Sequence, residues 1–368
     1  MTEAVAVGPR GVSYHKANGL YNSIDKETGL KSIRAAARER MKGHCQVCPV
    51  CNGVACAGEV PGMGGLGTGT AFRANLEALA AYRLEMRPLH DVAAPRTAVS
   101  LLGLELEIPV LAAPIGGVSF NMGGALSEDD YIRAKLEGCR AGGVIGCTGD
   151  GVPPFIHEAA FAAIHALDGH GIPFIKPWED AELFAKLEAA VATGAPAVGM
   201  DIDAAGLVTL RQMGRPVGPK SPSQMKRIIA QVPTPFIVKG IMTADQARLA
   251  VDVGAEAIVV SNHGGRVLDH MPGAAEVLPE IAAAVKGQVA ILADGGIRSG
   301  SDVLKMLALG ANAVLIGRPF SIATMGGLEE GVAALIDQLK NELQSAMVLT
   351  GCPDAAAVRP DILRPPAC

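Results

Sequence analysis

The sequence has few aromatic residues: of its 368 residues, 1 is tryptophan, 4 are tyrosine and 8 are phenylalanine. It also has no surplus of positive charge, because 32 lysine and arginine residues stand against 37 aspartate and glutamate residues, for a formal net charge of -5. A chain without a basic surplus is poorly suited to neutralising rows of phosphates, which argues against nucleic acid and anionic membrane surfaces as partners. We expect a small soluble substrate instead.

Long apolar runs are missing too. No segment reaches about 18 consecutive apolar residues, the length that a membrane-spanning helix needs, and the first residues, MTEAVAVGPRGVSYHK, contain no apolar signal core. We therefore expect a cytoplasmic protein with no membrane partner. The abundant residues favour a large core, because 49% hydrophobic residues and 45 glycines are typical of closely packed helices and strands rather than of disorder.

Cysteine is used sparingly except in one segment, HCQVCPVCNGVAC, which holds Cys45, Cys48, Cys51 and Cys56. In a reducing compartment, clustered cysteines are more typical of metal ligands or redox groups than of structural disulfides. The spacing C-x2-C-x2-C-x4-C is close to the ferredoxin pattern but is longer in its last interval, and four thiolates also suit tetrahedral zinc. A [4Fe-4S] cluster, zinc, and free thiols or a regulatory disulfide all remain open.

The other four cysteines are scattered, and a lone cysteine in an apolar setting usually packs as a small hydrophobic side chain. They are Cys139, Cys147, Cys352 and Cys368.

From residue 107 onward, short apolar runs alternate with amphipathic helical segments. There are eight runs: IPVLAAP, GGVIGC, IPFIK, AVGMDID, TPFIVKG, AIVVSN, VAILADGG and AVLIG. Strands that alternate with single helices pair in parallel through crossover connections. Eight such units in one run predict an α/β fold, a (β/α)8 TIM barrel with its final helices over residues 107–352.

Residues 1–106 do not follow this alternation and are predicted to form an N-terminal extension that is helical, cysteine-rich and glycine-rich. A helix is expected over residues 26–42, and GMGGLGTGT contains a literal G-x-G-x-x-G at Gly62, Gly64 and Gly67. No strand precedes these glycines, so a dinucleotide-binding turn is not expected and we interpret the segment as a lid. At the other end, residues 353–368 are predicted to be a C-terminal tail on the surface.

Charged and polar residues follow the predicted strands, where the active sites of such barrels gather. They are Lys176 after the third run, Asp201 and Asp203 after the fourth, Lys239 after the fifth, Ser261, His263 and Arg266 after the sixth, Asp294 after the seventh, and Gly317 and Arg318 after the eighth.

Two features after the seventh and eighth runs favour a phosphate-bearing cofactor. Gly295, Gly296 and Gly317 allow the backbone to approach a ligand closely, and Arg298 and Arg318 add fixed positive charge where barrels commonly hold phosphate.

The remaining polar residues predict proton removal from a small anionic substrate beside an electron acceptor. His263 can take a proton near neutral pH, and Asp203 could orient its ring and stabilise the imidazolium. Arg266 offers a bidentate fork to a substrate carboxylate, while Lys239 offers a point charge to an anion that develops on a cofactor.

Several segments resemble the FMN-dependent 2-hydroxy acid oxidising family, which includes glycolate oxidase and lactate oxidase. They are IVKG, SNHGGRVLD, ADGGIRSGSDVLKMLALGANAVLIGRP and LTGC, with weaker similarity back to RPLHDVA. The resemblance implies a (β/α)8 barrel, often assembled as a tetramer, with FMN across the strand ends.

By this resemblance, His263 is the base, Asp203 its partner, Arg266 the substrate clamp and Lys239 the charge beside the flavin N1 and C2 carbonyl. The resemblance also implies FMN contacts from Pro114, Ile115 and Gly116 near N5, Ser261 around the isoalloxazine, Asp294 at the ribityl chain, and Arg298 and Arg318 at the phosphate.

The substrate side departs from the family pattern. Lys176 stands where the family has a tyrosine, Phe174 where it has a glutamine and Asp201 where it has a threonine. The segment DIDAAGLVTL lacks the family's arginine, and the counterpart of its amino-terminal tyrosine falls near Gly62. Lys176 is therefore interpreted in two ways, as a substrate-binding cation or as an ion-pair partner of Asp201.

The predicted activity is FMN-dependent oxidation of a small 2-hydroxy acid to the 2-oxo acid by a homo-oligomeric enzyme, with oxygen or an electron-acceptor protein receiving the electrons. Two alternatives remain open. The same barrel could catalyse an isomerisation or an electron exchange with a protein, or the chain could be a non-catalytic flavin or metal redox sensor.

Overall fold

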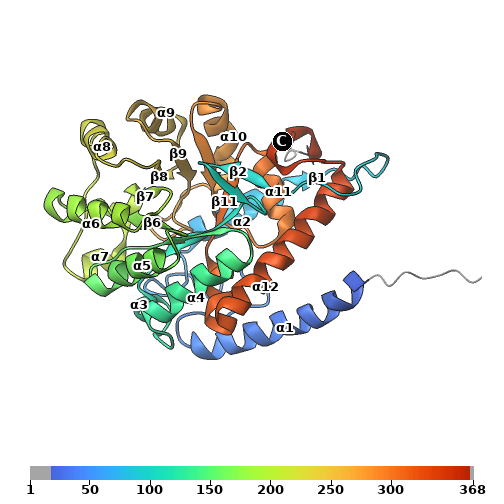
Figure 1. Ribbon diagram of the computed structural model, residues 1–368, viewed down its shortest axis with the longest axis horizontal. Helices are drawn as coiled ribbons and strands as arrows, with labels where there is room; N and C mark the ends of the chain where they lie inside the picture. Colours follow the sequence, from blue (N-terminus) through green and yellow to red (C-terminus); the bar gives the residue numbers. More distant parts are fainter. Residues whose placement is uncertain (1–17, 365–368) are drawn as a thin grey trace, which may run out of the picture.

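Eight parallel strands form a closed barrel in the middle of the molecule (Figure 1). The computed structural model describes residues 18–364, so residues 1–17 of the predicted extension and 365–368 of the predicted tail lie outside the described part. Each of the eight apolar runs supplies one strand, which confirms the predicted barrel. The strands are β4 (Val110–Ile115), β5 (Ile145–Thr148), β6 (Ile172–Ile175), β7 (Val198–Asp201), β8 (Phe236–Ile241), β9 (Ala257–Val260), β10 (Ala290–Ala293) and β11 (Ala313–Ile316).

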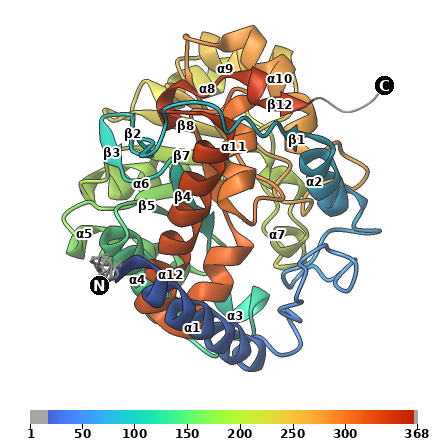
Figure 2. The same ribbon diagram turned by 90° about the vertical axis from the view of Figure 1, so that its right-hand side faces the viewer.

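Helices connect these strands and cover the outside of the barrel (Figure 2). The long gap between the first two runs holds an additional short helix, α3. The last helix contains non-helical backbone at Leu328, where φ is 51°, so it is two helices joined at a kink. The connecting helices are α3 (Val118–Asn121), α4 (Glu128–Ala141), α5 (Pro154–Ala166), α6 (Asp180–Ala192), the 3-10 helix η1 (Ile202–Gly206), α7 (Val208–Gln212), α8 (Pro222–Ile229), α9 (Ala244–Asp252), α10 (Ala274–Val285), α11 (Gly300–Ala308) and α12 (Arg318–Thr350).

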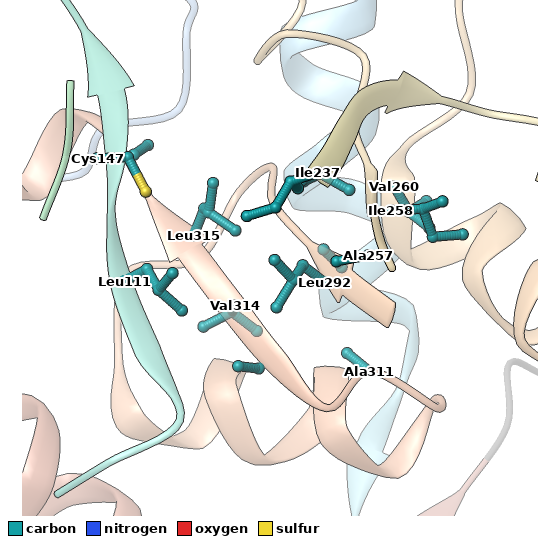
Figure 3. Packing of buried hydrophobic residues seen from close by; sticks show 14 of the residues in the cluster. Leu111, Cys147, Ile237, Ala257, Ile258, Val260, Leu292, Ala311, Val314 and Leu315 are labelled. Atoms are coloured by element: carbon teal, nitrogen blue, oxygen red, sulfur yellow. The ribbon is translucent and has the colours of Figure 1, made fainter. Parts of the chain in front are cut away.

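The inside of the barrel contains an apolar layer and, at the carboxyl ends of the strands, a charged layer. Apolar side chains from four strands converge in the enclosed space (Figure 3): Leu111, Ile237, Leu292 and Leu315. Lys239 lies two residues after Ile237, so it shares the inward face of β8, and the register pairs it with Asp201 of β7. The strand register therefore places charged side chains inside the barrel at its carboxyl end.

The amino-terminal extension packs against the barrel rather than forming a separate body. Helix α1 (Asn18–Arg40) lies alongside α12 in both views (Figures 1 and 2), and Arg40 Nη1 donates to the Met325 carbonyl at 2.7 Å. Helix α2 (Thr70–Ala81) packs against α10. The antiparallel hairpin β2 (Val99–Leu101) and β3 (Leu104–Leu106) leads into β4.

The carboxyl-terminal segment packs against the rest of the fold more closely than a surface tail would. After the 3-10 turns η2 (Ala355–Ala357) and η3 (Pro360–Ile362), β12 (Leu363–Arg364) pairs with β1 (Arg83–Leu84). Ile362 is buried in the main core. Most of residues 353–364 are exposed, but Ile362 anchors the segment, and one isoleucine in a polar, proline-rich stretch gave no periodicity from which this burial could be inferred. Among the described helices, none has both the length and the apolar composition to cross a membrane.

The docking of this segment can be tested with Ile362→Ala. We expect a loss of about 2–4 kcal/mol in the free energy of unfolding, measured by urea denaturation, because a buried side chain is truncated. Leu89→Ala is the control, since Leu89 is 99% exposed and should change stability by less than about 0.5 kcal/mol. Equal stabilities of the two variants would contradict the packing of Ile362.

Candidate active site

A pocket opens at the carboxyl ends of the barrel strands and gathers most of the predicted site residues. Two predicted residues, Ser261 and Asp203, do not line the pocket but contact residues that do. Ser261 Oγ donates to Asp294 Oδ2 at 2.8 Å, and Asp203 contacts His263. The structure therefore brings all predicted flavin and substrate residues into one site. Those that line the pocket are Pro114, Ile115, Gly116, Lys176, Asp201, Lys239, His263, Arg266, Asp294, Gly295, Gly296, Arg298, Gly317 and Arg318.

His263 and Asp203 form a pair. Asp203 follows β7 on the 3-10 helix η1, and its Oδ1 lies 3.0 Å from His263 Nδ1. Both side chains are mostly buried, with 16% and 11% of their surfaces exposed. Because Nδ1 faces the carboxylate, Nε2 is the ring nitrogen left for a ligand in the pocket. The carboxylate orients the ring and stabilises its protonated form.

The backbone at His263 is held in an unusual conformation. Its φ is 57°, a left-handed value that is uncommon for residues other than glycine and that often marks functional sites. The His263 amide donates to Ser261 Oγ at 3.0 Å, which helps to fix this turn. Gly264 and Gly265 follow with positive φ, so the chain turns away immediately and leaves the imidazole at the pocket wall.

The Lys239 ammonium lies at the centre of the charged layer. Its Nζ is 3.2 Å from Asp201 Oδ1, 3.5 Å from His263 Nδ1 and 4.0 Å from Asp294 Oδ2. Burial alone would lower the pKa of Lys239, but the surrounding carboxylates, Asp201 first, outweigh burial and raise it. Lys239 is therefore a permanent positive charge facing the pocket.

The carboxyl group of Asp201 has a lowered pKa, so it stays ionised in this layer. Burial raises the pKa of Asp201, but the ammonium groups of Lys239 and Lys176 outweigh burial and lower the pKa to about 2. Lys176 Nζ lies 3.6 Å from Asp201 Oδ2, so of the two interpretations of Lys176 the ion pair is the one that the structure shows. For Asp294, burial dominates and raises the pKa.

Three ligand atoms in this layer could hold a metal ion, since those of Asp201, Asp203 and His263 lie within 4.8 Å of one another. The Lys239 ammonium already contacts two of these three groups. It therefore supplies the positive charge that a metal ion would bring, and we assign no metal to this triad.

Three arginines crowd one side of the pocket, next to the glycine-rich lid. Arg266 donates to the Gly62 carbonyl and, at 3.0 Å, to Asn121 Oδ1. Arg318 lies with its guanidinium carbon 3.9 Å from the centre of the Phe72 ring, and its Nε donates to the Met63 carbonyl at 2.6 Å. The sequence predicted ligand contacts for these arginines but did not foresee that they would also hold the lid.

The close approach of the three arginines indicates that this side of the pocket binds an anionic ligand. Burial lowers the pKa of Arg266 to about 10. Burial together with the charges of Arg266 and Arg298 lowers the pKa of Arg318 to about 9. Within residues 18–364, Arg298 Nε is buried without a hydrogen-bond partner. A phosphate group would relieve the mutual repulsion and accept the free N–H, which fits the predicted cofactor.

Sequence reasoning missed Asp150, which is buried just after β5. Its Oδ1 lies 2.8 Å from Lys186 Nζ, and its Oδ2 accepts from the Lys176 amide at 3.0 Å and from Trp178 Nε1. Asp150 thereby ties the loop after β5 to the loop after β6 and fixes the backbone of Lys176. The rule applied to the other strands, a charged residue that follows an apolar run, would have found it.

The glycines of the lid serve packing rather than dinucleotide binding. Among residues 18–69 the structure has no strand before this segment, which leads directly into α2. A Cβ on Gly64 would lie 2.0 Å from the Cys56 carbonyl oxygen, so this position has no room for a side chain. Each of the four clustered cysteines is a free, partly buried thiol outside the lining of the main pocket.

Comparison with known proteins finds a matching family and similar enzymes. A family model described as FMN-dependent dehydrogenase matches residues 62–212 and 208–365. L-lactate oxidase of Lactobacillus jensenii is 31% identical over 317 residues, which are 76% of this chain and 74% of that protein. 2-Hydroxyacid oxidase 2 of Bos taurus is 31% identical over 321 residues, 79% of this chain and 88% of that protein.

A solved structure extends the similarity to the whole fold. The crystal structure of mandelate oxidase superposes with a TM-score of 0.73 at 30% identity, covering 91% of this chain and 97% of that one. The family model begins at residue 62, so the segment with the four cysteines lies before the residues that it matches.

The central ion pairs lead to a prediction for Asp201→Asn. Loss of the carboxylate leaves two buried ammonium groups underbalanced, and we expect a loss of about 3–5 kcal/mol in the free energy of unfolding near neutral pH. Asp252→Asn, at an exposed aspartate on α9, is the control and should change stability little.

The same variant tests the pKa of Asp201. Because the folded-state pKa is below the unfolded value, the stabilisation by this carboxylate is present above about pH 4 and is lost as the pH falls towards about 2. Urea unfolding over this range should show about 2 kcal/mol more acid-induced loss in the wild type than in Asp201→Asn. Identical pH dependences would contradict the ion-pair assignment.

Proposed function

The chain belongs to the FMN-dependent dehydrogenase family and is an FMN-dependent oxidoreductase, and we propose that it oxidises a small 2-hydroxy acid to the 2-oxo acid with His263 as the base. The observation that carries the proposal is the His263–Asp203 pair at 3.0 Å in the same pocket as Lys239 and Arg266. Together they provide a base, a positive charge and a carboxylate-binding fork in one place.

The residues present fit FMN. Arg298 and Arg318 would hold the phosphate, as their crowding and the free Arg298 N–H suggest. Asp294 Oδ1 is buried and without a hydrogen-bond partner within the described residues, so it can accept from a ribityl hydroxyl. Lys239 would lie beside the flavin ring as a fixed positive charge. Bound FMN supplies a two-electron acceptor.

The protein residues then handle the substrate and its proton. Arg266 would hold the substrate carboxylate with the N–H groups that the lid leaves free. His263 Nε2 takes a proton either from the hydroxyl group or from the α-carbon, and Asp203 stabilises the resulting imidazolium. Both routes use the same residues.

The wall of the pocket suggests which 2-hydroxy acids fit. Apolar side chains from α3, from α7 and from the residues on either side of α7 line it, among them Phe120, Leu207, Leu210 and Met213. Lys176 faces the same pocket but is paired with Asp201, so its charge is largely balanced. We therefore propose a 2-hydroxy acid with an apolar side chain in preference to glycolate, which has none to bury.

The base assignment is tested with His263→Ala. The variant should retain FMN but reduce it about 10²–10⁴-fold more slowly, because general base catalysis is lost. The measurement is anaerobic stopped-flow mixing with a panel of 2-hydroxy acids, following the loss of oxidised-flavin absorbance. His165→Ala, at a histidine on α5 that does not line the pocket, is the matched control. Flavin reduction at the wild-type rate in His263→Ala would rule out the proposed base, and a panel without any reducing acid would rule out the proposed substrate class.

The carboxylate clamp is tested with Arg266→Lys, which keeps the charge but loses the planar fork. We expect the apparent Kd of the 2-hydroxy acid, from the concentration dependence of flavin reduction, to rise about tenfold or more. Arg211→Lys is the control, since Arg211 does not line the pocket and its Nη2 donates to the nearby Ala205 carbonyl on the exposed surface. An unchanged Kd in Arg266→Lys would exclude the clamp.

A further inference from the structure

The four clustered cysteines line a second cavity next to the flavin pocket. Cys45, Cys48, Cys51 and Cys56 all contribute to its wall, and the remaining wall includes Arg318. We propose that these four cysteines bind a [4Fe-4S] cluster, which takes electrons one at a time from reduced FMN. The inference that a cluster binds depends only on the cysteine cavity. The inference of electron transfer depends in addition on the flavin site of the proposed function.

The sulfur atoms are too widely spaced to surround a single tetrahedral ion. Around tetrahedral zinc, with Zn–S bonds of about 2.3 Å, thiolate sulfurs lie about 3.8 Å apart. Among the described residues, no three of the four sulfurs lie within 4.8 Å of one another, although all four cysteines surround one cavity. A [4Fe-4S] core spaces its thiolate ligands more widely than one zinc ion does, and three cysteines in C-x2-C-x2-C are a common set of ligands for it.

Arginines of α1 hold the cysteine loop by its backbone. Arg34 Nη2 donates to the Cys48 carbonyl at 2.6 Å, and Arg38 Nη2 donates to the Val47 carbonyl at 2.9 Å. These contacts fix the carbonyls of the loop on its α1 side. A Cβ on Gly53 would lie 2.3 Å from the Phe72 ring, so the loop is also tightly packed on the side of α2.

Hydrogen-bond donors and positive charge surround the sulfurs. Arg298 Nη2 lies 3.4 Å from Cys51 Sγ, and the Val47 amide donates to Cys45 Sγ at 3.4 Å. Four thiolates make a [4Fe-4S] cluster anionic, and such donors stabilise it and tune its potential. Arg318 lines both cavities, so the arginines could balance the charge of an FMN phosphate and of a cluster.

The two cavities share part of their walls, Met63 and Arg318. A cluster in the second cavity would therefore lie one layer of side chains from the flavin pocket. Reduced FMN holds two electrons, and a cluster held by the four cysteines would accept them one at a time and pass each to a one-electron acceptor protein. Each oxidised substrate then reduces two acceptor molecules, and the protons of the reduced flavin go to solvent.

The cluster is tested by preparing the full-length holoprotein without oxygen and measuring iron, labile sulfide and zinc, with the EPR spectrum after dithionite reduction. The wild type should contain about four iron and about four sulfide ions per chain and give the spectrum of a reduced cluster. Cys51→Ser should lose this signal and most of the iron, while Cys352→Ser, at a cysteine outside the cavity, should keep both. FMN content checks that each variant is folded.

A wild-type protein without iron and sulfide, or with one zinc ion per chain, would overturn the cluster. Iron retained in full by Cys51→Ser would overturn the ligand assignment. Should Cys51→Ser fail to fold, the iron and sulfide content and the EPR spectrum of the wild type decide the question.

Electron transfer is tested separately by photoreduction of the bound FMN in the presence of EDTA, with no 2-hydroxy acid added. The EPR signal of the reduced cluster should rise as the absorbance of oxidised flavin falls. A fully reduced flavin beside a cluster that stays oxidised would overturn the transfer. Because no substrate is present, this result does not depend on whether the enzyme oxidises a 2-hydroxy acid.

Discussion

The buried ammonium of Lys239 is the contact on which the polar layer of the barrel depends. Without it, the carboxylates of Asp201 and Asp294 would face each other inside the barrel with only Lys176 to balance them. Burial of like charges is costly unless a counter-charge is close. With it, the layer keeps a positive group beside the pocket and leaves His263 free to pair with Asp203. One lysine therefore both stabilises the fold and prepares the site for an electron-rich cofactor.

A second constraint comes from the arginines below the lid. Arg266, Arg298 and Arg318 repel one another in a buried region, and the carbonyls of Gly62, Met63 and the cysteine loop accept their N–H groups. The lid is thus attached to the residues expected to hold phosphate and substrate carboxylate. The same arginines therefore line the pocket and hold the backbone of the lid.

Much of the barrel was predictable because its signals are local. Each strand is a short apolar run, and each charged residue after a run belongs to the carboxyl end of the barrel, so Lys239 and Asp294 could be placed without coordinates. Asp150 obeys the same rule and was overlooked. Ile362 could not have been placed, since its burial depends on pairing between β12 and β1 across most of the chain. The double role of Arg266 and Arg318 was equally hidden, because their lid partners are more than 200 residues away.

The sequence by itself determined the alternation of strands and helices, the order of the polar residues along it and the cysteine spacing. These follow from side-chain periodicity and from chain-local geometry. Only the tertiary structure decided that Lys176 pairs with Asp201, that Nδ1 of His263 faces Asp203, and that the cysteine cavity shares Arg318 with the flavin pocket. Such distances are set by closure of the barrel and by the packing of the lid onto it, which bring together residues that no local pattern connects.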